Sequence, residues 1–182
     1  NGVDYIMYLS CASGINGYNQ IICNPSEKKL SDGDILIIDT GSTVNGYFCD
    51  FDRNFGFGNI NQKSLDAYNK LWNATEKTLE IIKPGISCKE VYESLSKNLF
   101  SSNVKSNVGR MGHGFGLQLT EPPSIMIDDN TILEKNMILA IEPSIEIENG
   151  LILVHEENIL ITENGNRLLT TRTPKELPVI NV

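Results

Sequence analysis

A β-hairpin signal in the first third of the chain constrains the fold most strongly. Two apolar runs, at residues 35–38 and 47–49, flank Asn45-Gly46. Asn-Gly between apolar runs is the strongest short-range signal for a two-residue hairpin turn. Such a turn pairs Val44 with Tyr47 and thereby fixes the register of every residue pair that follows along both strands.

Two acids interrupt these apolar runs. The predicted register places Asp50 opposite Gly41, two positions from Asp39, so both carboxylates share a face at about 7–8 Å between their backbones. Carboxylates this close raise each other's pKa, and a divalent cation between them removes the conflict. A solvated acidic face on an exposed hairpin is the alternative, and the hairpin alone supports both interpretations equally.

A second acidic hairpin is predicted around Glu148-Asn149-Gly150, with Glu142 in its first apolar run and Glu156 in its second. The predicted strands cover residues 137–147 and 151–162. A three-residue bulged loop pairs Glu142 with Glu156, whereas a two-residue turn at Asn149-Gly150 pairs Glu142 with Glu157. The sequence leaves both registers open. We expect Glu157 to lie on the solvent side or around the acidic site.

A strand and two helices complete the predicted scaffold. The strand covers residues 5–9, the first helix is capped by Ser64 and ends at Pro84-Gly85, and the second begins at Ser87. Glu90, three residues after Ser87, completes a capping box. The apolar positions are Tyr68, Leu71, Trp72, Leu79 and Ile82 in the first helix and Val91, Leu95 and Leu99 in the second. Their helical period indicates that both helices contribute to the core and carry no chemistry.

His113 stands in the most glycine-dense segment, at residues 109–116, and is one of only two histidines. A lone histidine is more often a core or surface residue than a metal ligand. Here the surrounding glycines allow the backbone to approach its neighbours closely while the imidazole is held in place. His113 is therefore a candidate ligand.

Composition excludes several classes of function. The 182 residues are long enough for one domain, and a net charge of −8 argues against a nucleic-acid partner. The four cysteines have no paired spacing that would predict a zinc site or disulfides. No apolar run has membrane-spanning length, and the given sequence does not open with a basic region followed by an apolar one. We expect a cytoplasmic protein that contacts neither nucleic acid nor membrane, cut from a longer chain because it begins without Met.

Two Asp, two Glu and one His form a donor set that suits a pair of divalent ions. Carboxylates can bridge two ions, and imidazole favours Mn, Fe, Co or Zn over Mg or Ca. Two ions about 3.5–4 Å apart can share one water, lower its pKa and direct it at a carbonyl carbon.

These residues, in this order, resemble the pita-bread metallopeptidases. The matching features are Asp39, Asp50 eleven residues later, Gly112-His113-Gly114, Ile141-Glu142-Pro143 and Glu156. The family includes methionine aminopeptidase, aminopeptidase P and prolidase, with creatinase and a dimethylsulfoniopropionate lyase as non-peptidase relatives. The residues around Asp50 resemble the Xaa-Pro peptidases most closely.

The resemblance covers roughly residues 30–170 and implies an α+β fold. In this fold two pseudo-symmetric halves surround a curved antiparallel sheet. We expect residues 1–182 to form most of one catalytic domain, without the helix that usually opens it. The N-terminal domain of a longer chain would also be absent.

The resemblance also implies the roles of the site residues. The ligands of two divalent ions would be Asp39, Asp50, His113, Glu142 and Glu156. Asp50 and Glu156 would bridge both ions, and His113 and Glu142 would be catalytic, with Glu142 assisting proton transfer. A metal-bridging hydroxide would attack an amide carbonyl of a small peptide.

Three positions depart from the family pattern. The family usually has a substrate-contacting histidine seven residues after its metal-binding histidine, and that position is Thr120 here. A second histidine is usual near position 23, which is Cys23, and an arginine is usual at position 154, which is Val154. The metal ligands are therefore retained while the residues expected to contact substrate are changed.

The preferred interpretation is a metal-dependent hydrolase of the Xaa-Pro aminopeptidase or dipeptidase type. One alternative is a non-peptidase enzyme on the same fold, a creatinase-like C–N hydrolase or a lyase, acting on a small molecule. Another is a binding protein without catalysis, but such a protein would be expected to lose ligands. A homodimer is compatible with either enzyme.

Overall fold

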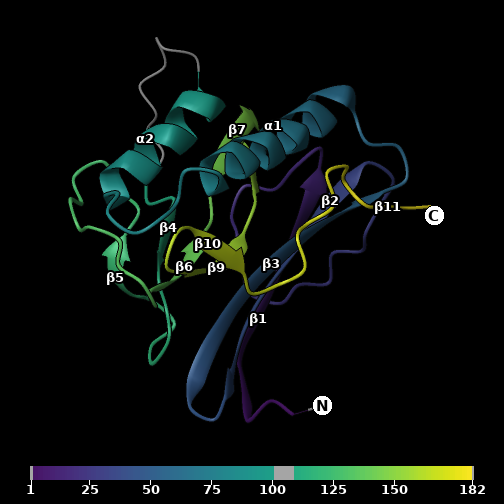
Figure 1. The fold of residues 1–182 in the computed structure, drawn as a ribbon. Helices are drawn as coiled ribbons and strands as arrows, with labels where there is room; N and C mark the ends of the chain where they lie inside the picture. Colours follow the sequence, from purple (N-terminus) through teal and green to yellow (C-terminus); the bar gives the residue numbers. More distant parts are fainter. Residues whose placement is uncertain (1, 101–108, 182) are drawn as a thin grey trace.

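The computed structural model describes residues 2–100 and 109–181, which form an α+β structure (Figure 1). In chain order the elements are β1 (Tyr5–Ile15), β2 (Asp34–Val44), β3 (Tyr47–Phe57), α1 (Gln62–Leu79), α2 (Cys88–Leu99), β4 (Gly112–Gly114), β5 (Glu121–Ser124), β6 (Ile138–Ile141), β7 (Ser144–Glu148), β8 (Leu151–Val154), β9 (Glu157–Ile161), β10 (Asn166–Leu168) and β11 (Val179–Ile180). The two helices lie side by side above the sheets.

The first hairpin has the predicted turn. Val44 pairs with Tyr47, and Asn45 and Gly46 both adopt positive φ, as a two-residue turn of this kind requires. The hairpin is the centre of a sheet with the order β1-β2-β3-β11. The predicted strand at residues 5–9 extends further than expected, to Ile15, and β11 adds to β3 in the parallel direction.

The second hairpin is interrupted, in contrast to the two continuous strands predicted for it. Its tip forms the two-stranded sheet β7-β8, while β6 and β9 join a separate sheet with the order β10-β9-β6-β4-β5. Pro143 stands between β6 and β7, where it has no N–H to donate to the ladder. The hydrogen bond from His155 N to Pro143 O, at 3.0 Å, holds the two segments together across the break.

The register of this hairpin combines the two alternatives. Glu148 pairs with Leu151, which leaves Asn149-Gly150 as a two-residue turn, and a bulge follows between Glu146 and Glu148. The bulge restores the register of the three-residue loop. Beyond it Ser144 pairs with Val154, so that Glu142 and Glu156 occupy equivalent positions on the two segments.

The helices differ from prediction in their boundaries. α1 is capped by Asn61, whose side chain accepts from Ser64 N, so the predicted cap at Ser64 is wrong by three residues. α1 also ends at Leu79, and Ile82 is buried beyond its end. The capping box of Ser87 with Glu90 is confirmed. Neither of the helices in the described ranges is long and apolar enough to cross a membrane.

Two hydrophobic cores correspond to the two halves of the molecule. In one core α1, through Tyr68 and Leu71, packs with Ile35 and Ile37 of β2 and with the β7-β8 hairpin. In the other core α2 packs on β6 and β9; its members include Val91, Leu95, Leu139, Ile141 and Ile159. Each hairpin is therefore backed by a helix, and the acidic segments lie where the two halves meet.

Candidate metal centre

The first hairpin carries three carboxylates on one face. Its register pairs Gly41 with Asp50 and Asp39 with Asp52. Asp50 therefore lies diagonal to Asp39, as predicted, and Asp52 lies on the same side because it is two residues beyond Asp50. Asp52 was not among the predicted site residues, although the same turn places it opposite Asp39.

Glu142 and Glu156 both lie in the interruption of the second hairpin. Glu142 follows β6 and Glu156 precedes β9. Glu142 N donates to Met111 O at 3.0 Å. At these positions the backbone leaves one ladder and enters another, which allows both side chains to turn toward the first hairpin.

His113 is presented by β4 at close range to its neighbouring strands. A Cβ on Gly112 would lie 2.4 Å from Ala140 O, and one on Gly114 would lie 2.6 Å from Pro122 O. Both contacts are too short for a side chain, so the glycines allow the close approach of β4. His113 Nδ1 lies 2.8 Å from Gly114 O. Because a carbonyl oxygen only accepts, Nδ1 carries the proton.

The Nε2 atom of His113 consequently faces the acids. It lies 3.4 Å from Asp50 Oδ2 and 3.6 Å from Glu142 Oε1. A neutral imidazole whose Nδ1–H is held by a backbone carbonyl presents the Nε2 lone pair, which is the usual arrangement for a metal-binding histidine.

All the predicted site residues line one cavity of about 490 Å³. They are Cys23, Asp39, Asp50, His113, Thr120, Glu142 and Glu156, and they are joined there by Tyr8, Asp52, Arg110 and Val154. Tyr8 and Arg110 were missed because each becomes relevant only through long-range pairing, whereas Asp52 was already contained in the predicted register of the first hairpin.

Burial dominates the electrostatics of the cavity. It raises the pKa of Asp39 and Glu142 above their usual values, and raises the pKa of Asp52 and Glu156 further because neighbouring acids repel their charges. Burial also lowers the pKa of His113, but the contact with Asp50 and the bond to Gly114 outweigh it and the net direction is upward. The environment of the cavity therefore disfavours the ionised forms of these carboxyl groups.

Two side chains donate hydrogen bonds to these acids. The Tyr8 hydroxyl contacts Asp50 and lies 2.8 Å from Asp39 Oδ1. Arg110 donates from Nε to Glu142 Oε1 at 3.2 Å. Glu156 Oε1 is buried and has no hydrogen-bond partner in residues 2–100 and 109–181.

The donor set fits divalent ions. Carboxylates and one imidazole are suitable ligands for Mn, Fe, Co or Zn, and the unpartnered Glu156 oxygen is an acceptor that a cation would satisfy. Within the described residues, no three such side chains already have the spacing to hold an ion. The Tyr8 hydroxyl lies between Asp39 and Asp50, so metal binding requires these side chains to rotate away from it.

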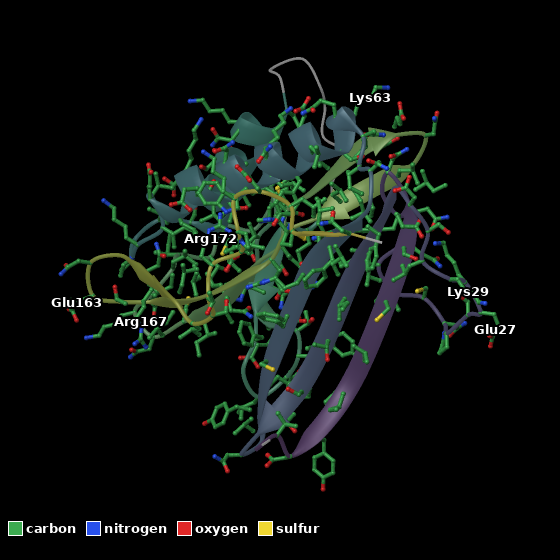
Figure 2. The ribbon with its side chains drawn as sticks, turned by 90° about the vertical axis from the view of Figure 1, so that its right-hand side faces the viewer. Glu27, Lys29, Lys63, Glu163, Arg167 and Arg172 are labelled. Carbon is green, nitrogen blue, oxygen red and sulfur yellow. The ribbon has the colours of Figure 1, made fainter. Side chains whose placement is uncertain are left out.

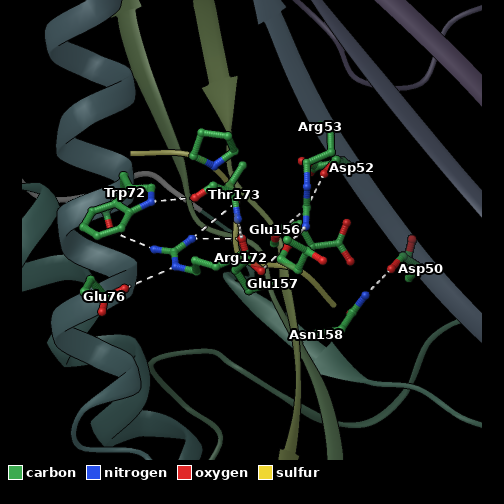
Figure 3. Close-up of polar contacts among 12 residues, drawn as sticks. Asp50, Asp52, Arg53, Trp72, Glu76, Glu156, Glu157, Asn158, Arg172 and Thr173 are labelled. Atoms are coloured by element: carbon green, nitrogen blue, oxygen red, sulfur yellow. Dashed lines mark hydrogen bonds and ion pairs between the residues drawn. The ribbon is translucent and has the colours of Figure 1, made fainter. Parts of the chain in front are cut away.

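Glu157 is fully buried and paired, so the expectation that it could lie on the solvent side is wrong. Arg172 Nη1 and Thr173 N each lie 2.9 Å from Glu157 Oε1, and Arg53 Nη2 lies 3.7 Å from Oε2 (Figure 3). Arg172 also rests on the Trp72 ring, 4.6 Å from its centroid. These contacts lie behind the acidic cavity.

The same network fixes the backbone beside the site. Arg53 donates to Glu156 O at 2.9 Å, and the Asn158 side chain donates to Asp50 O (Figure 3). These bonds connect β3 to the segment that carries Glu156. His155 points to the opposite side, as strand alternation predicts, and packs edge-on against Tyr68 with ring centroids 4.9 Å apart. Burial lowers the pKa of His155 to about 3.

Comparison with known proteins decides the family. The model of metallopeptidase family M24 matches residues 1–163. The chain belongs to metallopeptidase family M24. The predicted resemblance is thereby confirmed, and the family implies a divalent metal cofactor, for which the acidic cavity supplies a fitting donor set.

The M24 relatives include two archaeal Xaa-Pro dipeptidases. The chain is 34% identical over 154 residues to the Xaa-Pro dipeptidase of Pyrococcus furiosus, covering 84% of the chain and 44% of the relative. It is 34% identical over 186 residues to that of Pyrococcus horikoshii, covering 96% and 52%. The chain thus spans about half the length of these relatives.

Solved structures confirm the predicted fold. The X-Pro aminopeptidase from Thermotoga maritima superposes with a TM-score of 0.88 at 25% identity, covering 98% of this chain and 51% of the other. The prolidase from Pyrococcus furiosus gives a TM-score of 0.84 at 29% identity, covering 95% and 52%. The methionine aminopeptidase from Rickettsia prowazekii, at 22% identity and a TM-score of 0.76 over 90% of this chain and 73% of the other, shares the fold.

The buried network behind the site generates a stability prediction. Glu157→Gln leaves Arg172 and Arg53 without their shared counter-charge, and we expect the free energy of unfolding to fall by about 3 kcal/mol. Glu163→Gln is the control, because Glu163 lies at the edge of the molecule (Figure 2) and pairs with exposed Lys135, whereas Arg172 and Glu157 are largely buried. Denaturant unfolding measures both. Equal midpoints for the two variants would contradict the structural role of Glu157.

Proposed function

We propose that the protein is a metal-dependent hydrolase of the Xaa-Pro peptidase type. One observation carries the proposal. Four carboxylates at positions that match the family pattern line one cavity together with the Nε2 atom of one histidine. The ligands of two divalent ions are proposed to be Asp39, Asp50, His113, Glu142 and Glu156. The names of the archaeal relatives support the choice of Xaa-Pro peptides as substrates.

When bound, two divalent ions lower the pKa of a shared water and polarise a scissile carbonyl. The protein's own residues supply position and proton transfer. Asp50 and Glu156, from opposite hairpins, would be the ligands shared by the two ions. His113 is held in one tautomer by Gly114. Mn, Co, Fe or Zn all suit this donor set.

Glu142 is the residue best placed to move a proton. Its side chain is 24% exposed, so it reaches the open part of the cavity while remaining beside His113. Burial raises its pKa, although His113 and Arg110 counteract this. A carboxyl group with a raised pKa can accept a proton from the attacking water and donate it to the leaving nitrogen.

Metal binding is expected to stabilise the intact protein increasingly as pH rises through the raised pKa values of the acids in the cavity. In the metal-free protein the raised pKa values of Asp39, Glu142 and Glu156 mean that the folded state holds protons that the unfolded state releases. Its stability therefore falls as pH rises through those values. Metal affinity rises over the same range because the ligands must be deprotonated.

Calorimetric melting with and without Mn²⁺, together with elemental analysis, tests this dependence. Two ions per chain and a difference in melting temperature that grows with pH are expected. Glu156→Gln should abolish the difference, whereas Glu163→Gln, on the surface, should retain it. A wild-type protein that binds no transition metal and melts identically in Mn²⁺ and chelator would refute the proposed centre.

A small non-peptide substrate is the second candidate, favoured by the residues in the cavity wall. Thr120 and Cys23 stand where the family usually has histidines, and both line the cavity. The Cys23 thiol donates to Cys11 O at 2.9 Å, so it is already engaged. Neither residue can supply an imidazolium proton to a peptide carbonyl. A small molecule that carries its own charge depends less on such donors.

The rate at which the wild type turns over Xaa-Pro dipeptides distinguishes the two candidates, and Thr120→His tests the role of the missing histidine. Losing a preorganised donor typically costs about 10²–10³ in rate, so the Mn²⁺-loaded wild type is expected to turn over Xaa-Pro dipeptides slowly. Thr120→His should raise that rate or leave it unchanged while retaining the Mn²⁺-dependent melting shift. Wild-type turnover of roughly 1–10³ per second would instead establish the plain peptidase.

A further inference from the structure

Asp52 is a buried carboxylate that the family pattern does not use. Its residue is only 4% exposed, and it lines the same cavity as Asp39 and Glu156. In the part of the chain that the structure describes, no hydrogen bond or ion pair reaches its carboxylate; the only bond to Asp52 goes to its backbone oxygen. Figure 3 shows it next to Arg53.

Arg53 does not neutralise Asp52 by direct contact. Its guanidinium donates to three backbone carbonyl oxygens, including that of Asp52 itself, and it approaches Glu157 Oε2 at 3.7 Å. Its charge is thus directed at the network behind the site. The strand register instead sets Asp52 directly opposite Asp39, with Asp50 two residues away on the same face.

A structural role does not account for this placement. Buried carboxylates that support a fold are paired and hydrogen-bonded, as Asp34 is through Oδ2 by Lys28 and by Ser31 N. Asp52 has neither kind of partner, and its side chain is directed to a cavity whose other acids also require a cation. The unsatisfied Glu156 Oε1 in the same cavity is an independent sign of the same need.

We propose that Asp52 is a direct metal ligand, a fifth carboxylate added to the four carboxylates and one histidine of the proposed centre. The inference rests on the proposed function, because it requires that centre to bind ions. The charges of four carboxylates balance those of two divalent ions, and a fifth carboxylate gives ligands and ions together a net charge of −1. The additional negative charge holds the ions more tightly. A ligand set enriched in carboxylate oxygen also favours Mn²⁺ relative to the softer Zn²⁺.

Titration calorimetry of the metal-free intact protein with Mn²⁺ and with Zn²⁺ tests the assignment. Asp52→Asn keeps the size of the side chain and removes its charge. We expect the Mn²⁺ affinity of at least one site to fall by at least about 10-fold, and the Zn²⁺ affinity to fall by less. Asp34→Asn is the matched control, since Asp34 is equally buried on β2 but is paired with Lys28 outside the cavity.

Melting of the metal-free variants separates a ligand from a structural residue. Because no partner is lost, Asp52→Asn should melt no lower than wild type without metal, while its Mn²⁺-dependent shift shrinks. Asp52→Thr, which suits a strand, is the second variant should Asn impair folding. A lower metal-free melting temperature with unchanged Mn²⁺ affinity would assign Asp52 to structure and overturn the proposal.

The wild-type titration keeps the two proposals distinct. Two Mn²⁺ sites in wild type that are unchanged in Asp52→Asn would reject Asp52 as a ligand and leave the proposed centre intact. Absence of any Mn²⁺ binding in wild type would reject the centre itself, and the role of Asp52 with it.

Discussion

The withdrawal of several like charges from water is the constraint on which the site depends. Five carboxylates, from Asp39, Asp50, Asp52, Glu142 and Glu156, line one cavity. In the described structure the basic side chains lining that cavity are His113 and Arg110. Burial of unpaired carboxylates is strongly unfavourable unless protons or cations compensate them. Divalent ions satisfy this requirement with the ligand chemistry that the M24 family implies.

Both halves of the fold are needed to assemble this cluster. The first hairpin is backed by α1 and the second acidic segment by α2, each through its own core. Arg53 and Asn158 then fasten the segment bearing Glu156 to β3 through backbone carbonyls. The proposed ligands therefore sit on strands or strand ends whose positions are fixed by packing, an arrangement that limits the backbone movement needed for metal binding.

Local sequence signals made part of the fold and of the site predictable. Asn45-Gly46 allows one favourable turn, and that turn alone determined where Asp39 and Asp50 lie. The Ser87 cap was predictable for the same reason, because its partner Glu90 is three residues away. Glycines beside His113 indicated a close backbone approach, and the structure shows that the approach is to β5 and β6.

Other features depend on contacts between distant residues. Glu157 looks like a surface acid in the sequence, and only the fold brings Arg172 and Arg53 to it. The cap of α1 was misplaced because Asn61 and Ser64 are both good capping residues and the sequence does not rank them. The interruption at Pro143 was underestimated, although a proline lacks the N–H that a continuous ladder needs. Asp52 is different: the predicted register already contained it.

Diffraction from crystals of the intact protein grown with Mn²⁺, measured for anomalous scattering, tests the central claim most directly. The account predicts two anomalous peaks about 3.5–4 Å apart in the acidic cavity, with Glu156 bonded to both and Tyr8 displaced from between Asp39 and Asp50. A cavity without an anomalous peak, with Tyr8 still bridging Asp39 and Asp50 at saturating Mn²⁺, would contradict it.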